Sequence, residues 1–417
     1  MPSSQSPTLA RTSNFKDLGL SPEFVQLLVR RGITDPLPIQ SLAIPDGLAG
    51  RDVSGRAPTG SGKTLAFSLP MAARLERGRP RRPVGLVLAP TRELAAQIAA
   101  ELSPFAAVRG LRVHAFYGGV GYGPQLKALE RGVDIVVACP GRLEDLMGSR
   151  HVVLDDVTIV VVDEADRMAD MGFLPAVRRI LDTTRDDRQT LLFSATLDGD
   201  VDVLVRRYQR DPVRHDVGAS DDITHMTHRF HYVAHDERVA TCAQLVTQAG
   251  STIVFVRTRH GADRLVKQLG RSGVDAVAVH GDRSQAQRER ALRAFGSGSA
   301  RALVATDVAA RGIHVDDVAC VIHFDLPDDP KDYVHRSGRT ARAGADGVVV
   351  SLVTPENRAA ADTLRKALGL TPESDGAVPP PSREPRAPQG PRHGASHAPN
   401  RGASRHRGSS ARGRSRA

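Results

Sequence analysis

The residues with the clearest chemistry form the stretch Ala57–Thr64, Ala-Pro-Thr-Gly-Ser-Gly-Lys-Thr, which precedes a helix-prone run. Its two glycines let the chain turn tightly, so that consecutive N–H groups and the positive end of the following helix face one anion. Lys63 can then reach the β- and γ-phosphates of a nucleotide, and the Thr64 hydroxyl can hold Mg²⁺. The pattern predicts a phosphate-binding loop, against the alternative of a simple Gly/Ser turn before a helix. Ala57 departs from the general pattern, which begins with glycine.

Two adjacent carboxylates, Asp163 and Glu164, follow the apolar run 159–162. At the end of a strand, Asp163 is placed to hold Mg²⁺ and Glu164 to orient or deprotonate an attacking water. The alternative is a helix N-terminus, where acidic residues are favoured by the helix dipole. In combination with Lys63 and Thr64, the pair predicts metal-assisted hydrolysis of a phosphoanhydride.

Arginines are concentrated in the stretch His335–Arg342, His-Arg-Ser-Gly-Arg-Thr-Ala-Arg, in the second half of the chain. Arg339 and Arg342 are three residues apart, so we expect them to share one helical face. If the two halves close together, these side chains can stabilise charge on a γ-phosphate. The alternative is a solvated basic helix face.

Short apolar runs that alternate with helical segments must position these residues. This rhythm predicts an α/β fold with βαβ units and parallel sheets. Polar residues follow the runs, as expected for ligand sites at the carboxyl ends of strands. A helix is expected to begin at Ser21–Pro22–Glu23, with others over 93–102 and 175–181. The expected strands are 84–89, 133–138, 158–162 and 190–193, then 252–256, 275–279, 302–305, 319–322 and 348–353.

The length of 417 residues and the 40% hydrophobic content fit two domains. We expect a disordered segment over 1–14, a first domain over 15–217, a linker over 218–228, and a second domain over 229–370. The net charge of +10 favours a polyanionic partner. Three cysteines without metal-ligand spacing fit a reduced compartment. Without an apolar leader or membrane-length run, a soluble, cytoplasmic protein is expected.

The C-terminal stretch 371–417 has nine arginines against three acidic residues and is rich in Pro, Gly and Ser. Such a composition predicts a disordered, Arg-rich tail. The tail is expected to add sequence-independent, salt-sensitive affinity for phosphates. The alternative is a solubilising extension without a defined role.

These motifs, together with Pro90–Leu94, Ser194–Thr196 and Ala305–Gly312, resemble those of the DEAD-box RNA helicases of superfamily two, in the family's order over about residues 15–365. The resemblance implies two tandem RecA-like domains that bind ATP and Mg²⁺ in a cleft and RNA across both domains.

The resemblance also assigns roles to individual residues. Phe15 packs on adenine, and Gln40 reads it through an amide that both donates and accepts. The implied phosphate contacts are Thr59, Gly60, Ser61, Gly62, Lys63 and Thr64. The implied catalytic residues are Lys63, Asp163, Glu164, Arg339 and Arg342. The residues implied to couple hydrolysis to domain closure are Ser194, Thr196 and His335. The implied RNA contacts are Pro90, Thr91, Arg92, Gly118, Gly119, Pro140, Gly141, Arg142, Thr258, Gly281, Gln287, Arg290, Thr306 and Asp307.

Five positions depart from the family pattern. Ile33 replaces an aromatic residue and Leu37 a threonine, which puts adenine selectivity in question. Cys139 replaces a threonine, and His314 stands where an aspartate touches the ribose. Ala341 replaces a glycine, a change expected to be tolerated.

The stretch 166–173 resembles bacterial RhlE-type members of the family. The leading hypothesis is an ATP-dependent helicase that opens short RNA duplexes by local strand bending. An ATP-gated RNA clamp or assembly factor and a DNA-acting helicase are the alternatives. The expected partner is RNA, bound through its backbone. The protein is expected to be a monomer that does not bind membranes. Ribosomes and RNA-decay assemblies are the larger assemblies in which it could take part.

Overall fold

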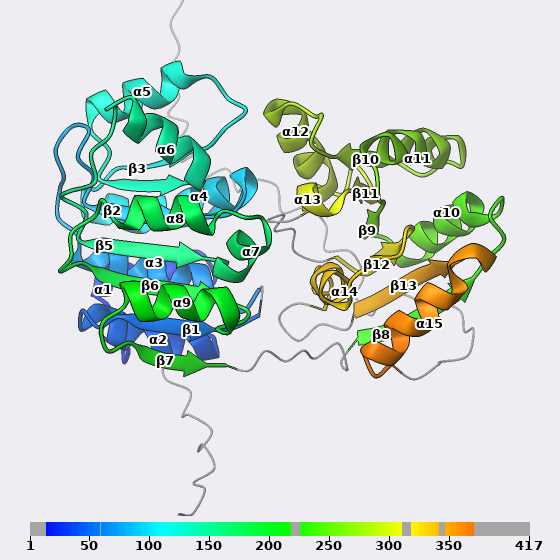
Figure 1. Ribbon diagram of the computed structural model, residues 1–417, viewed down its shortest axis with the longest axis horizontal. Helices are drawn as coiled ribbons and strands as arrows, with labels where there is room; N and C mark the ends of the chain where they lie inside the picture. Colours follow the sequence, from blue (N-terminus) through cyan, green and yellow to red (C-terminus); the bar gives the residue numbers. More distant parts are fainter. Residues whose placement is uncertain (1–13, 59, 218–225, 311–317, 342–346, 371–417) are drawn as a thin grey trace, which may run out of the picture. The chain divides into compact units, whose positions relative to one another are not determined.

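The computed structural model describes residues 14–58, 60–217, 226–310, 318–341 and 347–370. Within them, two parallel sheets define two α/β lobes, each with helices on both sheet faces (Figure 1). The predicted fold class, two RecA-like domains with parallel sheets, is therefore confirmed. The tail, the segment 1–13 and residues 218–225 of the expected linker lie outside the described residues.

The first sheet has seven parallel strands in the order β3-β4-β2-β5-β6-β1-β7. The strands are β1 (Val53–Arg56), β2 (Gly85–Leu88), β3 (Val113–Phe116), β4 (Ile135–Ala138), β5 (Ile159–Asp163), β6 (Gln189–Ser194) and β7 (Val213–Asp216). The helices are α1 (Pro22–Arg30), α2 (Pro38–Leu48), α3 (Lys63–Arg74), α4 (Arg92–Val108), α5 (Tyr122–Arg131), α6 (Pro140–Gly148), α7 (Ala165–Asp170), α8 (Leu174–Leu181) and α9 (Gly199–Tyr208).

The second sheet has six parallel strands in the order β10-β11-β9-β12-β13-β8. The strands are β8 (Met226–Tyr232), β9 (Thr252–Phe255), β10 (Ala276–Val279), β11 (Ala302–Ala305), β12 (Cys320–His323) and β13 (Gly347–Val353). The helices are α10 (Arg238–Ala249), α11 (Arg259–Arg271), α12 (Gln285–Gly296), α13 (Asp307–Ala310), α14 (Pro330–Ser337) and α15 (Arg358–Ala367), with a 3₁₀ turn, η3, at Pro355–Asn357.

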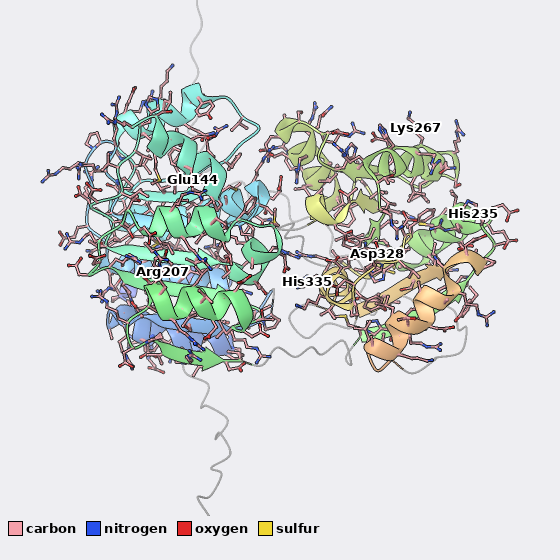
Figure 2. The ribbon with its side chains drawn as sticks, in the orientation of Figure 1. Glu144, Arg207, His235, Lys267, Asp328 and His335 are labelled. Carbon is pink, nitrogen blue, oxygen red and sulfur yellow. The ribbon has the colours of Figure 1, made fainter. Side chains whose placement is uncertain are left out.

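Each sheet separates two hydrophobic cores, because successive residues of a strand point to opposite faces. In β5, Val161 packs with α1–α4 on one face, while Val160 and Val162 pack with α5–α9 on the other. The same alternation divides Ile253 and Val254 of β9. Charged side chains lie on the outer surfaces, as Arg207 and Lys267 illustrate (Figure 2).

The nine expected strands all correspond to strands of the two sheets, within about two residues at each end. Four further strands, β1, β3, β7 and β8, were not predicted. The expected linker of 218–228 extends too far, because 226–228 already belong to β8, which pairs along β13. As an edge strand, β8 is only partly buried and carries His and Arg, so it lacks an apolar run.

No helix among the described residues is long and apolar enough to cross a membrane. The three cysteines, Cys139, Cys242 and Cys320, are free.

Candidate functional site

The phosphate-binding loop follows β1 directly, at the carboxyl end of the first sheet. The Ala57 N–H donates to the carbonyl of Ser194 at 3.0 Å, which continues the strand pairing by one residue. The Ala57 side chain is fully buried in the core, and its backbone does not adopt a positive φ. Alanine therefore fits at this first position of the loop, where the general pattern has glycine.

The loop ends at Gly62, the N-cap of α3, which has φ +87° and makes no side-chain cap hydrogen bond. The first N–H groups of α3 are therefore left for an anion. The Lys63 Nζ is buried and donates to the carbonyls of Ala57 at 2.8 Å and Pro58 at 3.2 Å. The ammonium group has three N–H donors, so one is left for a phosphate oxygen, which is a stronger acceptor for a cation than a carbonyl.

Gln40, in the first turn of α2, holds the end of this loop. Its Oε1 accepts from the Leu37 N–H at 2.9 Å, and its Nε2 donates to the Gly62 carbonyl at 3.1 Å. One N–H and one lone pair of the amide remain for a base, so the predicted adenine contact is compatible with this geometry. Phe15 is 2% exposed and packs within the core of the first lobe. Its stacking on adenine stays a prediction.

Asp163 and Glu164 lie at the boundary between β5 and α7. The Asp163 Oδ1 accepts from the Glu164 N–H at 3.0 Å, and both side chains are buried. Glu164 is the N-cap of α7 and has φ +50° and ψ +52°, a left-handed conformation that is costly for a residue with a Cβ. The pair Asp163–Glu164 therefore both ends β5 and begins α7, so the two interpretations of this pair, a strand-end site and a helix N-terminus, hold together.

The two carboxyl groups differ in their electrostatic surroundings. Burial raises the pKa of Asp163 to about 7, against the opposing charge of Lys63. Burial also acts to raise the pKa of Glu164, but nearby positive charges, led by Arg167, outweigh it and lower the pKa. The Arg167 Nη1 lies 3.6 Å from the Glu164 Oε2, which has no hydrogen-bond partner within the described part of the chain. Glu164 is therefore an ionised carboxylate with accepting capacity to spare, as a general base requires.

The residues present fit a magnesium–nucleotide complex. Mg²⁺ in such complexes takes one or two protein oxygens and completes its shell with phosphates and water. Thr64 in the first turn of α3 and Asp163 would supply those oxygens, and a divalent cation would stabilise the Asp163 carboxylate, which burial disfavours. Among the described residues no group of three or more His, Cys, Asp or Glu could hold a metal without such help.

The segment 194–196 is bound to the start of α7 by two reciprocal hydrogen bonds. The Asp166 N–H donates to the Ser194 Oγ at 3.1 Å, and the Ala195 N–H donates to the Asp166 Oδ2 at 3.2 Å. Thr196 is exposed. Asp166 therefore joins 194–196 to the segment that carries Asp163 and Glu164, and the coupling role of Ser194 and Thr196 stays a prediction. His335, the third coupling candidate, is on α14, and burial lowers its pKa.

The RNA candidates of the first lobe lie where β2, β3 and β4 end, and these strands are neighbours in the order β3-β4-β2. Pro90, Thr91 and Arg92 follow β2, Gly118 and Gly119 follow β3, and Pro140, Gly141 and Arg142 follow β4. The structure thus brings all eight to one end of the sheet. Thr91 also caps α4, because its Oγ1 accepts from the Leu94 N–H at 3.3 Å.

Cys139 precedes this group as the N-cap of α6 and makes no side-chain cap hydrogen bond. Burial raises the pKa of its thiol to about 12, so the thiol stays protonated and weakly polar. Cys139 therefore offers only a weak donor at the position where a threonine would offer a strong hydroxyl donor.

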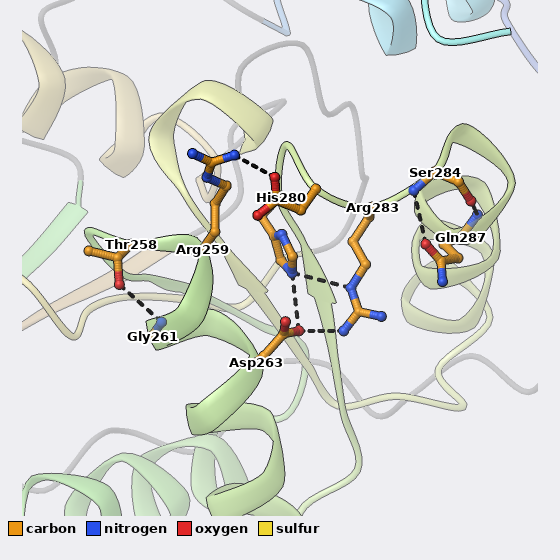
Figure 3. Close-up of polar contacts among 9 residues, drawn as sticks. Thr258, Arg259, Gly261, Asp263, His280, Arg283, Ser284 and Gln287 are labelled. Carbon is orange, nitrogen blue, oxygen red and sulfur yellow. Dashed lines mark hydrogen bonds and ion pairs between the residues drawn. The ribbon is translucent and has the colours of Figure 1, made fainter.

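The candidates of the second lobe, shown in part in Figure 3, follow β9, β10 and β11; Thr306 and Asp307 come directly after β11. Thr258 caps α11 by accepting from the Gly261 N–H at 3.0 Å. Gln287 forms a reciprocal capping box with Ser284 at the start of α12, in which the Ser284 N–H donates to Gln287 at 2.9 Å. Gly281 and Arg290 are exposed near these helix starts. Thr258 and Gln287 therefore have structural roles beside any contact with RNA.

Two arginines that the sequence reasoning did not assign hold predicted residues in place. Arg336 is 5% exposed and binds Asp307 through two hydrogen bonds of 2.6 and 2.8 Å. It also donates to the Asp325 carbonyl at 2.7 Å. Arg167 neutralises Glu164 from one helical turn away. The signals for both were present, since Arg167 stands three residues after Glu164 and Arg336 adjoins His335.

The expectation that Arg339 lies on a helical face is wrong. The helix α14 ends at Ser337 with Gly338 as its C-cap, so Arg339 follows the helix. Arg339 is nevertheless 4% exposed. Ala341 adopts φ +54°, so the residue that replaces a glycine is in a conformation that suits glycine better. Thr59, His314 and Arg342 lie outside the described residues.

A phosphate-binding loop, strand-end carboxylates and two parallel α/β lobes define an ATP-binding protein of the helicase class. A family model described as DEAD/DEAH box helicase matches residues 37–204, and one described as helicase conserved C-terminal domain matches residues 237–344. The chain belongs to the DEAD-box ATP-dependent RNA helicases.

Individual relatives support this assignment. DEAD-box ATP-dependent RNA helicase 30 of Arabidopsis thaliana is 41% identical over 375 residues, which are 88% of this chain and 63% of that protein. Helicase 20 of the same plant is 41% identical over 364 residues, 85% of this chain and 73% of that protein. The structure of S. cerevisiae Dbp5 bound to RNA and ADP BeF3 has a TM-score of 0.75 and 28% identity, covering 85% of this chain and 93% of its own.

The finer resemblance to bacterial RhlE-type members is not supported. The relatives named above are eukaryotic, as is the fungal ATP-dependent RNA helicase DBP2 of Meyerozyma guilliermondii, which is 40% identical over 379 residues. The stretch 166–173 contains all of α7 except its first residue, and the Asp166 and Arg167 side chains of this helix contact 194–196 and Glu164. Such a structural demand does not distinguish one subtype from another.

Proposed function

We propose that this chain hydrolyses ATP in response to RNA and uses the cycle to open short RNA duplexes locally. The observation that carries the proposal is Glu164, a buried, ionised carboxylate in a left-handed backbone conformation whose Oε2 has no hydrogen-bond partner in the described part of the chain. Strain of this kind is retained where the chemistry needs it. Membership of the helicase family supports ATP and RNA as the ligands.

In this proposal each residue of the site has one task. Lys63 and the N-terminus of α3 bind the phosphates, and Glu164 accepts the proton of the attacking water. Thr64 and Asp163 would hold Mg²⁺, which would neutralise charge on the phosphates. Arg339 stabilises the charge that develops in the transition state, and we extend the same role to Arg342.

RNA is bound through its backbone in the proposal, without readout of base sequence. The candidates after β2, β3 and β4 are arginines, glycines, prolines and a threonine, which suit phosphate and sugar contacts. The tail 371–417 adds nonspecific phosphate affinity through its nine arginines. Deletion of 371–417 should weaken RNA binding and reduce its salt dependence, and unchanged affinity and slope would contradict this role.

We further propose that the protein acts as a monomer in the cytoplasm. The three free thiols support a reducing compartment. Crosslinking of RNA to the protein in cells, followed by sequencing, would show whether ribosomal RNA or RNA in decay is bound. Sedimentation of the purified chain with and without RNA tests the monomeric state.

The function is tested by measuring ATP hydrolysis and strand displacement on the same short RNA duplex. The proposal predicts hydrolysis stimulated by RNA and displacement that requires ATP. Stimulated hydrolysis without displacement would replace the helicase with an ATP-gated clamp. If single-stranded DNA and RNA stimulate hydrolysis equally, the ligand is single-stranded nucleic acid in general and not RNA in particular. If neither stimulates hydrolysis, the proposal is contradicted.

A further inference from the structure

Tyr122, the first residue of α5, is an exposed aromatic side chain that is held in place from two directions. It is 44% exposed, and its hydroxyl donates to the Asp145 Oδ2 on α6 at 3.0 Å. The Arg142 guanidinium lies 4.0 Å from the centre of its ring. A ring fixed at its edge and against a cation loses little further conformational freedom when a ligand packs against it.

Arg142 brings a positive charge to this ring without a counterion of its own. It is 8% exposed and donates to the Val120 carbonyl at 3.2 Å, while its Nε and Nη1 have no hydrogen-bond partner. No salt bridge to a carboxylate is found for Arg142 in the described part of the chain. A largely desolvated cation that meets a carbonyl and a ring face but no negative charge is unfavourable. The site is therefore suited to an external anion.

The loop that carries Tyr122 is flanked by a second arginine and by open space. A Cβ on Gly119 would lie 2.0 Å from the Arg92 Nη1, so Arg92 packs directly against the loop. By contrast, a Cβ on Gly121, Gly123 or Gly141 would meet nothing within 4 Å. The loop thus has two guanidinium groups against it, Arg92 at Gly119 and Arg142 at Val120 and the Tyr122 ring, with open space at Gly121 and Gly123.

We propose that Tyr122 is a stacking platform for one nucleobase of single-stranded RNA, and that it positions Arg142 for the adjoining phosphate. The proposal rests on the RNA-binding function above and adds a residue and a type of contact to it. Bases stack on aromatic rings irrespective of sequence, because every base has a π-face. Stacking on a ring beside arginines suits a polymer that alternates flat bases with phosphates better than it suits an acidic peptide.

The test compares Tyr122→Leu, Tyr122→Phe and the control Tyr232→Leu. Tyr232 is also exposed, at 42%, and lies under an arginine, Arg358, at 5.2 Å, but on the second lobe away from any predicted RNA contact. A single-stranded RNA of mixed sequence carries 2-aminopurine at successive positions, because stacking of this base quenches its fluorescence. RNA-stimulated ATP hydrolysis supplies KM for RNA and kcat, and thermal melting checks that each variant is folded.

Wild type should quench 2-aminopurine at one position of the bound RNA, and Tyr122→Leu should lose this quenching and raise KM for RNA about tenfold. Tyr122→Phe should retain both within about twofold, because the ring remains, and Tyr232→Leu should match wild type. Unchanged KM or unchanged quenching in Tyr122→Leu overturns the proposal. If wild-type hydrolysis is not stimulated by RNA at all, the proposed function itself fails, which is a distinguishable result.

Discussion

Replacement of Gly62 by alanine probes the contact between the phosphate-binding loop and Gln40. Gly62 has φ +87°, and a Cβ there would lie 2.3 Å from the Gln40 Nε2 and 2.7 Å from the Leu37 Cδ1. Gln40 cannot turn aside freely, since it is 2% exposed and its amide is bonded at both ends. The substitution must therefore break those bonds or move the loop.

The expected cost has two parts. A left-handed conformation costs an alanine about 1–2 kcal/mol, and overpacking of a buried site adds about 1–3 kcal/mol. The free energy of unfolding of the first lobe should fall by about 2–5 kcal/mol. For a domain of this size the melting temperature should fall by about 4–20 °C.

Gly110→Ala is the matched control, because Gly110 has φ +71° and a Cβ there meets nothing within 4 Å. It should show only the conformational part of the cost, and its affinity for a fluorescent ATP analogue should equal that of wild type. Gly62→Ala should weaken that affinity at least about tenfold, because the N–H groups of the loop and of α3 lose their alignment. Equal melting temperatures and equal affinities for the two variants would refute the reasoning.

Three further changes test other parts of the molecule. His323 is buried, with its Nδ1 3.1 Å from the Ser351 hydroxyl, and burial lowers its pKa well below 6.5. Below pH 6.5 the unfolded chain therefore binds a proton at this residue that the folded chain does not. The free energy of unfolding should fall as the pH drops below 6.5, by up to about 1.4 kcal/mol per pH unit. Urea unfolding at about pH 7.5 and about pH 5.5 should show this loss in wild type and in the exposed control His260→Gln, but less of it in His323→Leu; an equal loss in His323→Leu would contradict it. Ala341→Gly should raise the free energy of unfolding by about 1 kcal/mol, measured in urea, because φ is +54° there; a decrease would show that the positive φ carries no strain. Arg336→Lys should raise KM for RNA while wild-type melting is largely kept, because lysine cannot bind both oxygens of Asp307; an unchanged KM would remove Asp307 from the RNA site.

Much of the fold could be predicted because parallel strands buried on both faces are continuous apolar runs. Val160–Val162 and Leu303–Val304 are of this kind. The strands that escaped prediction lack such runs. In β1 the sequence Val-Ser-Gly-Arg is short and polar, and β3, β7 and β8 lie at sheet edges, where one side needs no pairing and burial is incomplete.

The candidate site was predictable where its residues are consecutive. The loop 57–64 and the pair Asp163–Glu164 are each contiguous and follow a strand, so the carboxyl end of the sheet gathers them. The supporting contacts were not predictable, because they join residues distant in sequence. Arg336 and Asp307 are separated by 29 positions, and only the fold shows that they meet. The end of α14 at Ser337, with Gly338 as its C-cap, likewise became known only from the structure.

Hydrolysis of ATP by a Glu164-containing site is the central claim, and Glu164→Gln tests it most directly. Glutamine preserves the shape of the side chain but cannot accept the proton of the attacking water. Glu101→Gln is the control, since Glu101 is also paired with an arginine, Arg31, at 2.7 Å on the same lobe but away from the loop. Binding of the fluorescent ATP analogue verifies that each variant still holds nucleotide.

The decisive measurement is the RNA-stimulated rate of ATP hydrolysis at saturating ATP. The account predicts that Glu164→Gln lowers kcat by about 10²–10⁴-fold with nucleotide affinity nearly intact, while Glu101→Gln hydrolyses ATP like wild type. Near-normal hydrolysis by Glu164→Gln would contradict the assignment of the base and, with it, the proposed mechanism.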